Sequence, residues 1–187
     1  MVALSRRHFV SSSLAGAAAL WLPAGARAAA CPRTESLTAG PFYRRGAPDS
    51  TDLRLSGVAG RELVLDLTVR GQDCKPVFPV LIDLWHADPR GNYDLEGFRF
   101  RTRHASDRPG VRLVTFVPGR YPGRTPHLHL TVSAPGHRPL TTQLYFPGAA
   151  LNERDFLFRP SLLLNLASDI QSAGPLSGSY TFYLQPA

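Results

Sequence analysis

Residues 111–134 read VRLVTFVPGRYPGRTPHLHLTVSA. Residues 111–117 are a short, mostly apolar run, and apolar and polar residues alternate in 127–134; both patterns are typical of a β-strand. The PGRYPGR segment between them is rich in Pro and Gly, residues that end strands and favour turns. This stretch therefore predicts two strands joined by an irregular loop.

The rest of the chain after residue 31 has the same organisation. Pro and Gly are numerous, 17 and 16 in the 187 residues, and follow no repeat. We expect further short strands, and one or two short helices near the C-terminus; the strands are 63–69, 77–86, 98–103, 140–146 and 179–185, and the helices lie within 150–172. Short strands separated by turns predict an all-β fold, an antiparallel β-sandwich, in one domain spanning residues 31–187.

The composition excludes two classes of partner. The 187 residues carry a formal charge of +7, and Lys75 is the only Lys among 21 basic residues. The arginines are scattered singly or in pairs and are not gathered into a basic patch interleaved with aromatics, so we expect no nucleic-acid binding. Apolar runs stop short of the ~20 residues that cross a bilayer, so we expect no stable membrane span.

Residues 1–28 resemble an export signal. The segment opens with Ser5-Arg6-Arg7-His8-Phe9, continues through a weakly apolar stretch to Leu22, and ends on Ala26-Arg27-Ala28. An Arg pair, an apolar core too short to span and a small-x-small cleavage site together indicate the twin-arginine route. We therefore predict a periplasmic or secreted protein; an ordinary N-terminal helix is the alternative.

The chain has two cysteines, Cys31 and Cys74. An even number of cysteines in an exported chain favours a disulfide. Two alternatives stay open at this point. Cys31 follows Ala28-Ala29-Ala30, a poor lipidation motif that would anchor the mature N-terminus, and both thiols could instead be free and buried.

The strongest chemical signal is the sequence Pro126-His127-Leu128-His129-Leu130. On a strand, alternate side chains share a face, so His127 and His129 point together while the leucines point to the opposite face. Paired imidazoles on a rigid strand are a common base for a metal site. Two packed core histidines are the alternative.

The remaining ligands must come from elsewhere, because residues 108–152 contain no Asp or Glu. Two tyrosines in Pro- and Gly-rich loops are candidates: Tyr93 in DPRGNYD and Tyr121 in PGRYPGR. A phenol has a pKa near ~10 and binds metal as phenolate only beside a strongly charged cation. That requirement favours Fe(III) over Zn(II), although two surface tyrosines would give the same pattern.

These residues resemble the intradiol ring-cleavage dioxygenases, the catechol and protocatechuate 3,4-dioxygenase type. The stretches that match, in order, are GPFY at 40–43, LIDLWHADPRGNYD at 81–94, FVPGRYPGRTPHLH at 116–129 and TTQLYFPG at 141–148. The chain is most similar to the small exported members of that family. Those members carry cysteines near the positions of Cys31 and Cys74, which supports the disulfide.

The resemblance implies a non-haem Fe(III) with four protein ligands: Tyr93, Tyr121, His127 and His129. Tyr121 would be the axial tyrosinate, which leaves the metal and takes a substrate proton. Two further residues fall at catalytic positions of the family. Arg124 would stabilise negative charge on the substrate, and Gln143 would lie beside the reacting ring. The roles of His86 and Tyr43 stay open.

The resemblance also implies the reaction. An aromatic 1,2-diol of the catechol class would be cleaved between its two hydroxyl-bearing carbons by O2, giving a muconate-type diacid. Two other functions are compatible with the residues: a non-catalytic exported β-sandwich binding module, and a zinc or copper enzyme that uses the His pair without the tyrosines. The identity of the catechol and the oligomeric state stay open.

Overall fold

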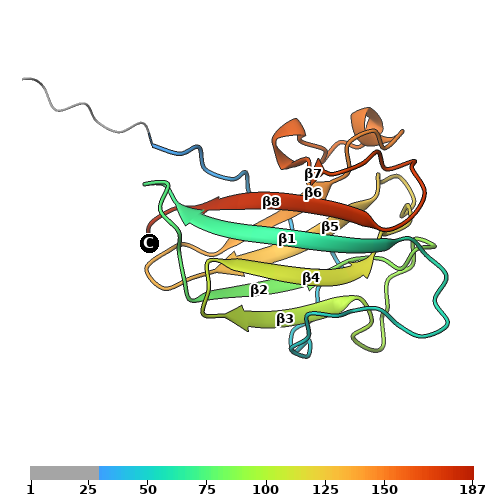
Figure 1. The fold of residues 1–187 in the computed structure, drawn as a ribbon, viewed down its shortest axis with the longest axis horizontal. Coiled ribbons are helices and arrows are strands. Elements are labelled where there is room, and N and C mark those ends of the chain that lie inside the picture. Colours follow the sequence, from blue (N-terminus) through green and yellow to red (C-terminus); the bar gives the residue numbers. More distant parts are fainter. Residues whose placement is uncertain (1–29) are drawn as a thin grey trace, which may run out of the picture.

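The computed structural model describes residues 30–187 as two stacked β-sheets (Figure 1). The predicted export segment lies outside these residues. One sheet has the order β4-β1-β8-β7 and the other β3-β2-β5-β6. The strands are β1 Glu62–Gly71, β2 Val80–Trp85, β3 Arg101–Ser106, β4 Gly110–Phe116, β5 His127–Ser133, β6 Leu140–Tyr145, β7 Asn165–Leu166 and β8 Leu176–Leu184. No helix long and apolar enough to cross a membrane occurs among residues 30–187.

The core lies between the two sheets and follows from the alternation in the sequence. Leu63, Leu65, Leu67 and Val69 of β1 are fully buried and alternate with half-buried residues. In β5 the inward-facing positions are apolar in the same way and pack in this core. Burying such side chains stabilises the fold by roughly 1.5–3 kcal/mol each. The opposite face of β5 is thereby left to its two histidines.

Two parts of the fold prediction were wrong. The sandwich is not wholly antiparallel, because β1 pairs in parallel with β8. The region 150–172 forms no α-helix; it contains two single 3₁₀ turns, Asn152–Arg154 and Pro160–Leu162, and the short strand β7. Leu162 and Leu164 are both buried at a spacing of two, which suits extended chain, and Pro160 cannot sit inside a helix.

The strand predicted at 98–103 begins later, at Arg101. Phe100, just before it, has φ 56° and is buried, so the chain turns there instead of extending. The segment FRFRTR alternates as a half-exposed strand does, which would turn its arginines to solvent, but Arg101 is only 2% exposed. Its guanidinium donates to the carbonyls of Phe42 (2.7 Å) and Asp94 (2.9 Å). Arg101 therefore ties together two loops that lie far apart in the sequence.

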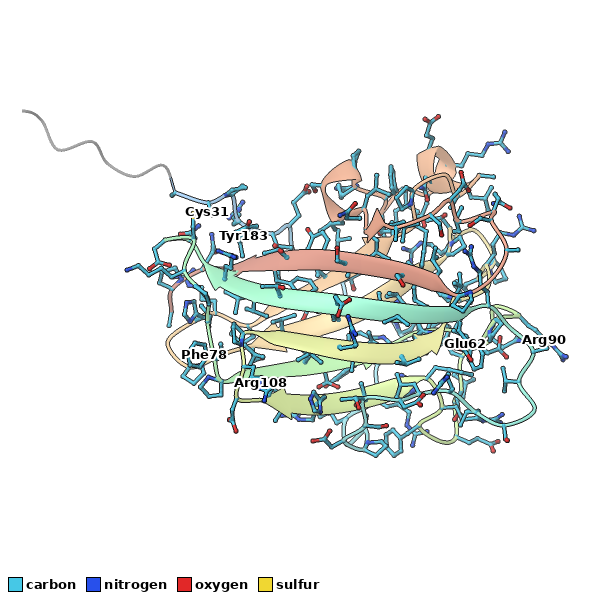
Figure 2. All side chains as sticks on the ribbon, in the orientation of Figure 1. Cys31, Glu62, Phe78, Arg90, Arg108 and Tyr183 are labelled. Carbon is cyan, nitrogen blue, oxygen red and sulfur yellow. A yellow bond between two sulfur atoms is a disulfide. The ribbon has the colours of Figure 1, made fainter. Side chains whose placement is uncertain are left out.

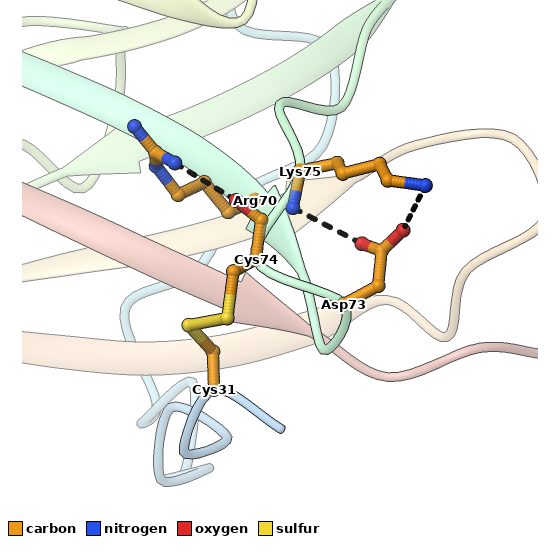
Figure 3. Close-up of a disulfide and its surroundings, with 5 residues drawn as sticks. All are labelled: Cys31, Arg70, Asp73, Cys74 and Lys75. Atoms are coloured by element: carbon orange, nitrogen blue, oxygen red, sulfur yellow. Dashed lines mark hydrogen bonds and ion pairs between the residues drawn. A yellow bond between two sulfur atoms is a disulfide. The ribbon is translucent and has the colours of Figure 1, made fainter. Parts of the chain in front are cut away.

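The N-terminal strap, residues 31–43, is fixed at its start by the Cys31–Cys74 disulfide (Figure 3). Backbone hydrogen bonds then hold it along the sandwich, from Cys31 N to Gln72 O (2.9 Å) and from Leu37 N to Thr141 O (2.9 Å). The prediction that the two cysteines pair is thus confirmed. Figure 2 places Cys31 and Tyr183 at the opposite end of the molecule from Arg90.

The disulfide closes a sequence separation of 43 residues. Chain-entropy arguments assign such a loop about 4 kcal/mol. We expect the double substitution Cys31→Ser/Cys74→Ser to lower the free energy of unfolding by about 2–4 kcal/mol, measured by urea titration. Reductant should destabilise the wild-type protein and leave the double variant unchanged. Equal stability of the wild type without reductant and of the double variant would contradict the prediction.

Candidate metal centre

The two histidines at the start of β5 bring their ring nitrogens together. His127 Nε2 and His129 Nε2 lie 3.1 Å apart, and the Thr125 carbonyl accepts a 2.7 Å hydrogen bond from His127 Nδ1. That bond leaves the Nε2 lone pair of His127 available as a ligand. Burial, with a smaller contribution from the Arg124 guanidinium, lowers the pKa of His127 to about 4. Burial also holds the pKa of His129 well below its usual value, so both imidazoles are neutral at pH 7, as metal ligation requires.

The last residue of strand β2 packs against the ring of His129. Trp85 lies opposite His129 in the β2–β5 pairing, and the two rings stack at 5.1 Å with an interplanar angle of 8°. Trp85 is therefore a core residue whose packing also fixes the imidazole. Tyr43 packs against Trp85 and donates a hydrogen bond to Asp83 Oδ2 (3.2 Å), which makes its role structural.

Tyr93 reaches the histidines from the loop that follows β2. Its hydroxyl lies 3.3 Å from His127 Nε2. Asp88 shapes the loop, because its Oδ1 accepts hydrogen bonds from the backbone N–H groups of Arg90 (2.8 Å) and Asn92 (2.9 Å). Burial raises the pKa of Tyr93 far above that of a free phenol. The protein alone therefore keeps this phenol protonated, and a nearby cation is needed to form the phenolate.

The ring of Tyr121 lies beside that of Tyr93. Their centroids are 6.0 Å apart, and Phe42 of the strap contacts both, stacked on Tyr93 at 4.4 Å and edge-on to Tyr121 at 5.3 Å. The strap thus covers the site, with Gly40 against the His129 ring. The structure brings Tyr93, His127 and His129 into mutual contact. Tyr121, from the loop after β4, joins them through ring contacts with Tyr93 and Phe42.

Backbone contact between the two tyrosine loops is unusually close. Gly119 N donates to the Asp88 carbonyl (2.9 Å). A Cβ at Gly91 would lie 1.9 Å from the Arg120 carbonyl oxygen, and a Cβ at Gly119 would lie 2.4 Å from that of Pro89. Only glycine permits this approach. The two loops therefore form one unit, and this unit sets the separation of Tyr93 and Tyr121.

Arg124 and Gln143, the two predicted catalytic residues, contact each other directly. Arg124 Nη2 donates to Gln143 Oε1 at 2.5 Å, and Gln143 Nε2 donates to the Thr38 carbonyl of the strap (3.1 Å). Gln143 lies opposite His129 in the β5–β6 pairing. The Tyr145 hydroxyl donates to the same Gln143 oxygen (2.9 Å). The pair is thus placed next to the histidines.

His86 takes no part in this cluster. It is buried, with Nδ1 2.7 Å from the Ala87 carbonyl and Nε2 2.8 Å from Thr115 Oγ1, so both nitrogens are engaged in the scaffold. Sequence analysis missed two residues that support the site, Asp155 and Phe42. Asp155 lies in the region expected to be helical. Phe42 belongs to the GPFY motif, in which Tyr43 was the only residue considered for a role in the site.

The donor set fits a hard trivalent ion. Within residues 30–187, no three His, Cys, Asp or Glu side chains form a metal-binding group. A metal at the His pair would therefore be completed by the phenol oxygens. Phenolate oxygens match Fe(III), whereas zinc sites use Cys, His and carboxylates. Beside Tyr121 a cavity of about 510 Å³ opens to solvent, lined in part by Arg90, Arg120 and Leu151.

Comparison with known proteins identifies relatives over most of the described chain. A family model described as dioxygenase matches residues 38–186. The hydroxyquinol 1,2-dioxygenase of Nocardioides simplex is 32% identical over 166 residues, which covers 75% of this chain and 57% of that protein. The catechol 1,2-dioxygenase of Acinetobacter baylyi is 31% identical over 159 residues, covering 69% and 50%. The chain thus spans about half the length of these relatives.

Solved structures give the same result. The dioxygenase domain of a dioxygenase carbohydrate-binding protein fusion from Streptomyces sp. SirexAA-E has a TM-score of 0.77 and 41% identity, covering 83% of this chain and 100% of that one. The 3-chlorocatechol 1,2-dioxygenase of Rhodococcus opacus has a TM-score of 0.75 and 29% identity, covering 82% and 73%. With the family model matched over nearly the whole sandwich, the chain belongs to the intradiol ring-cleavage dioxygenases.

Proposed function

We propose that this protein is a non-haem Fe(III) intradiol dioxygenase. It would cleave an aromatic 1,2-diol between the two hydroxyl-bearing carbons with O2 and release a muconate-type diacid. One observation carries the proposal: the Nε2 atoms of His127 and His129 lie 3.1 Å apart, with the Tyr93 hydroxyl 3.3 Å from one of them. The Tyr121 ring packs edge-on against the Tyr93 ring, with centroids 6.0 Å apart.

His127, His129, Tyr93 and Tyr121 would hold the iron. Two phenolates and two neutral imidazoles bring a charge of about −2 to the +3 ion, which reduces the cost of burying it. When bound, Fe(III) supplies the Lewis acidity that activates the diol ring toward dioxygen.

The chain's own residues would handle protons and charge. A diol must lose two protons to bind through both oxygens; the Tyr121 phenolate oxygen would accept one of them, and a hydroxide ion from solvent would accept the other. A separate Asp or Glu base is then unnecessary, which fits the acid-free stretch around the histidines. Arg124 would donate hydrogen bonds to the negative charge that develops on the substrate. Gln143, bonded to Arg124, would lie beside the reacting ring.

The substrate is proposed as a catechol-class diol. Support comes from relatives named as acting on catechol, hydroxyquinol and chlorocatechol. Of the four candidate ligands, Tyr121 lines the cavity of about 510 Å³ that opens to solvent.

Export by the twin-arginine route is part of the proposal, with residues 1–28 as the signal and residues 31–187 as a single mature domain. The sequence of the signal supports it. The Cys31–Cys74 disulfide supports it as well, because such bonds persist in oxidising compartments.

Oxygen uptake tests the proposed function. Protein purified with iron should be red-brown from tyrosinate-to-Fe(III) charge transfer, and should consume one O2 per diol cleaved in a screen of catechols. Mass spectrometry of the product decides between cleavage modes. A ring opened outside the two hydroxyls, or a colourless protein holding zinc with no O2 uptake, would overturn the assignment.

A further inference from the structure

Asp155 is the buried partner of Arg124. Both of its carboxylate oxygens accept from Arg124 Nε, at 2.9 and 2.8 Å. The Asp155 side chain is 0% exposed and that of Arg124 is 12% exposed. This ion pair is the most enclosed in the described part of the chain, because at least one side chain of each other pair there is more than 20% exposed. A buried charge pair that is fully hydrogen-bonded holds its partners in one geometry.

The carboxylate is itself held rigidly. Its Oδ2 accepts from Thr125 N (3.0 Å) and its Oδ1 from Leu157 N (3.0 Å). Thr125 Oγ1 donates to Asn152 Oδ1 (2.8 Å), which ties the 151–157 loop to the residue two before His127. Asp155 thus links the loop after β6 to the start of β5, with each carboxylate oxygen directed at specific donors.

The contact with Asp155 determines which nitrogens of the Arg124 guanidinium remain available to other partners. Nε is taken by Asp155, and Nη2 donates to Gln143 Oε1 and approaches the Tyr145 hydroxyl at 3.5 Å. Within residues 30–187, no acceptor bonds to Nη1. The guanidinium is therefore held through Nε and Nη2, and its carbon lies 5.9 Å from the centroid of the Phe156 ring. Nη1 is the nitrogen left for a further acceptor.

Charge gives a second reason for the pairing. Arg124 donates to Gln143, and Gln143 lies opposite His129 in the β5–β6 pairing, so the positive charge of Arg124 lies beside the candidate metal centre. A cation placed there would repel a bound metal ion unless a neighbouring anion compensated for it. The carboxylate of Asp155 provides that compensation at a distance of 2.8 Å.

We propose that Asp155 is a positioning residue that acts through Arg124, orienting the guanidinium toward the substrate and neutralising its charge beside the metal centre. The inference rests on the proposed function and deepens it. It assigns Arg124 the role of a directional hydrogen-bond donor, in a pair without net charge.

The first test compares Asp155→Asn with a matched control. Asp66 forms the same kind of pair with Arg112, at 2.7 and 2.9 Å, but both side chains are exposed. We expect Asp155→Asn to lower kcat by about 10- to 100-fold, as misplaced groups do, with KM changed less than about threefold. Iron content and the visible band should match those of the wild type. Asp66→Asn should leave all of these values unchanged.

A double-mutant cycle separates positioning from general structural support. If Asp155 acts through Arg124, adding Asp155→Asn to an Arg124→Met background should change kcat by less than about twofold. Losses that multiply, or a wild-type kcat in Asp155→Asn, would overturn the inference while the active wild-type enzyme still supports the proposed function. A wild type that cleaves no diol overturns both.

Arg124→Lys provides an independent test of the same inference if Asp155→Asn does not fold. Arg124→Lys retains the charge and Asp155 but lacks the Nε–H and the planar fork. Since orientation is what Asp155 is inferred to supply, Arg124→Lys should lose as much kcat as Arg124→Met, with iron and thermal stability retained. If Arg124→Lys keeps more than half of the wild-type kcat, charge alone suffices and the positioning role is wrong.

Discussion

Tyr93→Phe is expected to lower turnover of iron-loaded protein by more than about 100-fold, since residues that merely orient metal ligands already cost 10–100-fold. The substitution removes the oxygen that lies 3.3 Å from His127 Nε2 and keeps the ring that stacks on Phe42. The fold should therefore be unaffected. The visible charge-transfer band should also weaken, because the substitution removes one of the two proposed phenolate donors. Stopped-flow kinetics, absorption spectra and metal analysis measure the three effects.

Tyr180→Phe is the matched control for that experiment. Tyr180 is a strand residue in β8 whose hydroxyl donates to the Ser161 carbonyl (2.9 Å), outside the site. Losing that hydrogen bond should cost about 0.5–1.5 kcal/mol of stability and leave colour and rate unchanged. If Tyr93→Phe behaved like this control, Tyr93 would have no place in the metal centre.

Gly91→Ala is expected to remove most of the bound iron. The new Cβ would lie 1.9 Å from the Arg120 carbonyl oxygen, and the residue has φ +90°, which disfavours any side chain. The two loops must move apart, and Tyr93 and Tyr121 move with them. Backbone strain alone costs about 1–3 kcal/mol. Metal analysis after purification and thermal unfolding measure the loss of iron and of stability.

Gly136→Ala is the control that separates the effect of backbone strain from the effect of moving the two tyrosine loops apart. Gly136 has φ +69° in the turn between β5 and β6, and no atom lies within 4 Å of the Cβ that would be added. This variant should lose a similar amount of strain-related stability and keep its iron. Iron content near that of the wild type in Gly91→Ala would show that contact between the loops does not set the positions of the tyrosines.

Local pattern was enough to predict most strands. The segments with strict alternation or dense apolar content, such as 63–69 and 127–134, became β1 and β5 within one or two residues. The prediction failed where the pattern was ambiguous. The leucines of 162–166 fit either a helix or an extended chain, and packing against the sheets selected the extended form. β7 is two residues long, which is too short for any periodicity to identify.

The candidate site likewise contains residues that the sequence identified and residues that only the structure revealed. Residue chemistry and motif spacing singled out Tyr93, Tyr121, His127 and His129, because a strand places alternate histidines on one face and both tyrosines stand in Pro- and Gly-rich loops. The resemblance to the intradiol dioxygenases identified Arg124 and Gln143. Asp155 and Phe42 could not be found in this manner. Each lies dozens of residues from a partner that it contacts, and no local pattern records such a contact.

The sequence by itself determined the strand-forming segments, the turns and the kinds of ligand available, since all of these depend on the chemistry of neighbouring residues and on a period of two. The tertiary structure alone decided that β1 runs parallel to β8, that Arg101 is buried, and that Asp155 neutralises Arg124. The physical reason is that these features arise from contacts between distant segments. Such contacts form only when the burial of the whole core offsets the entropy of bringing the segments together.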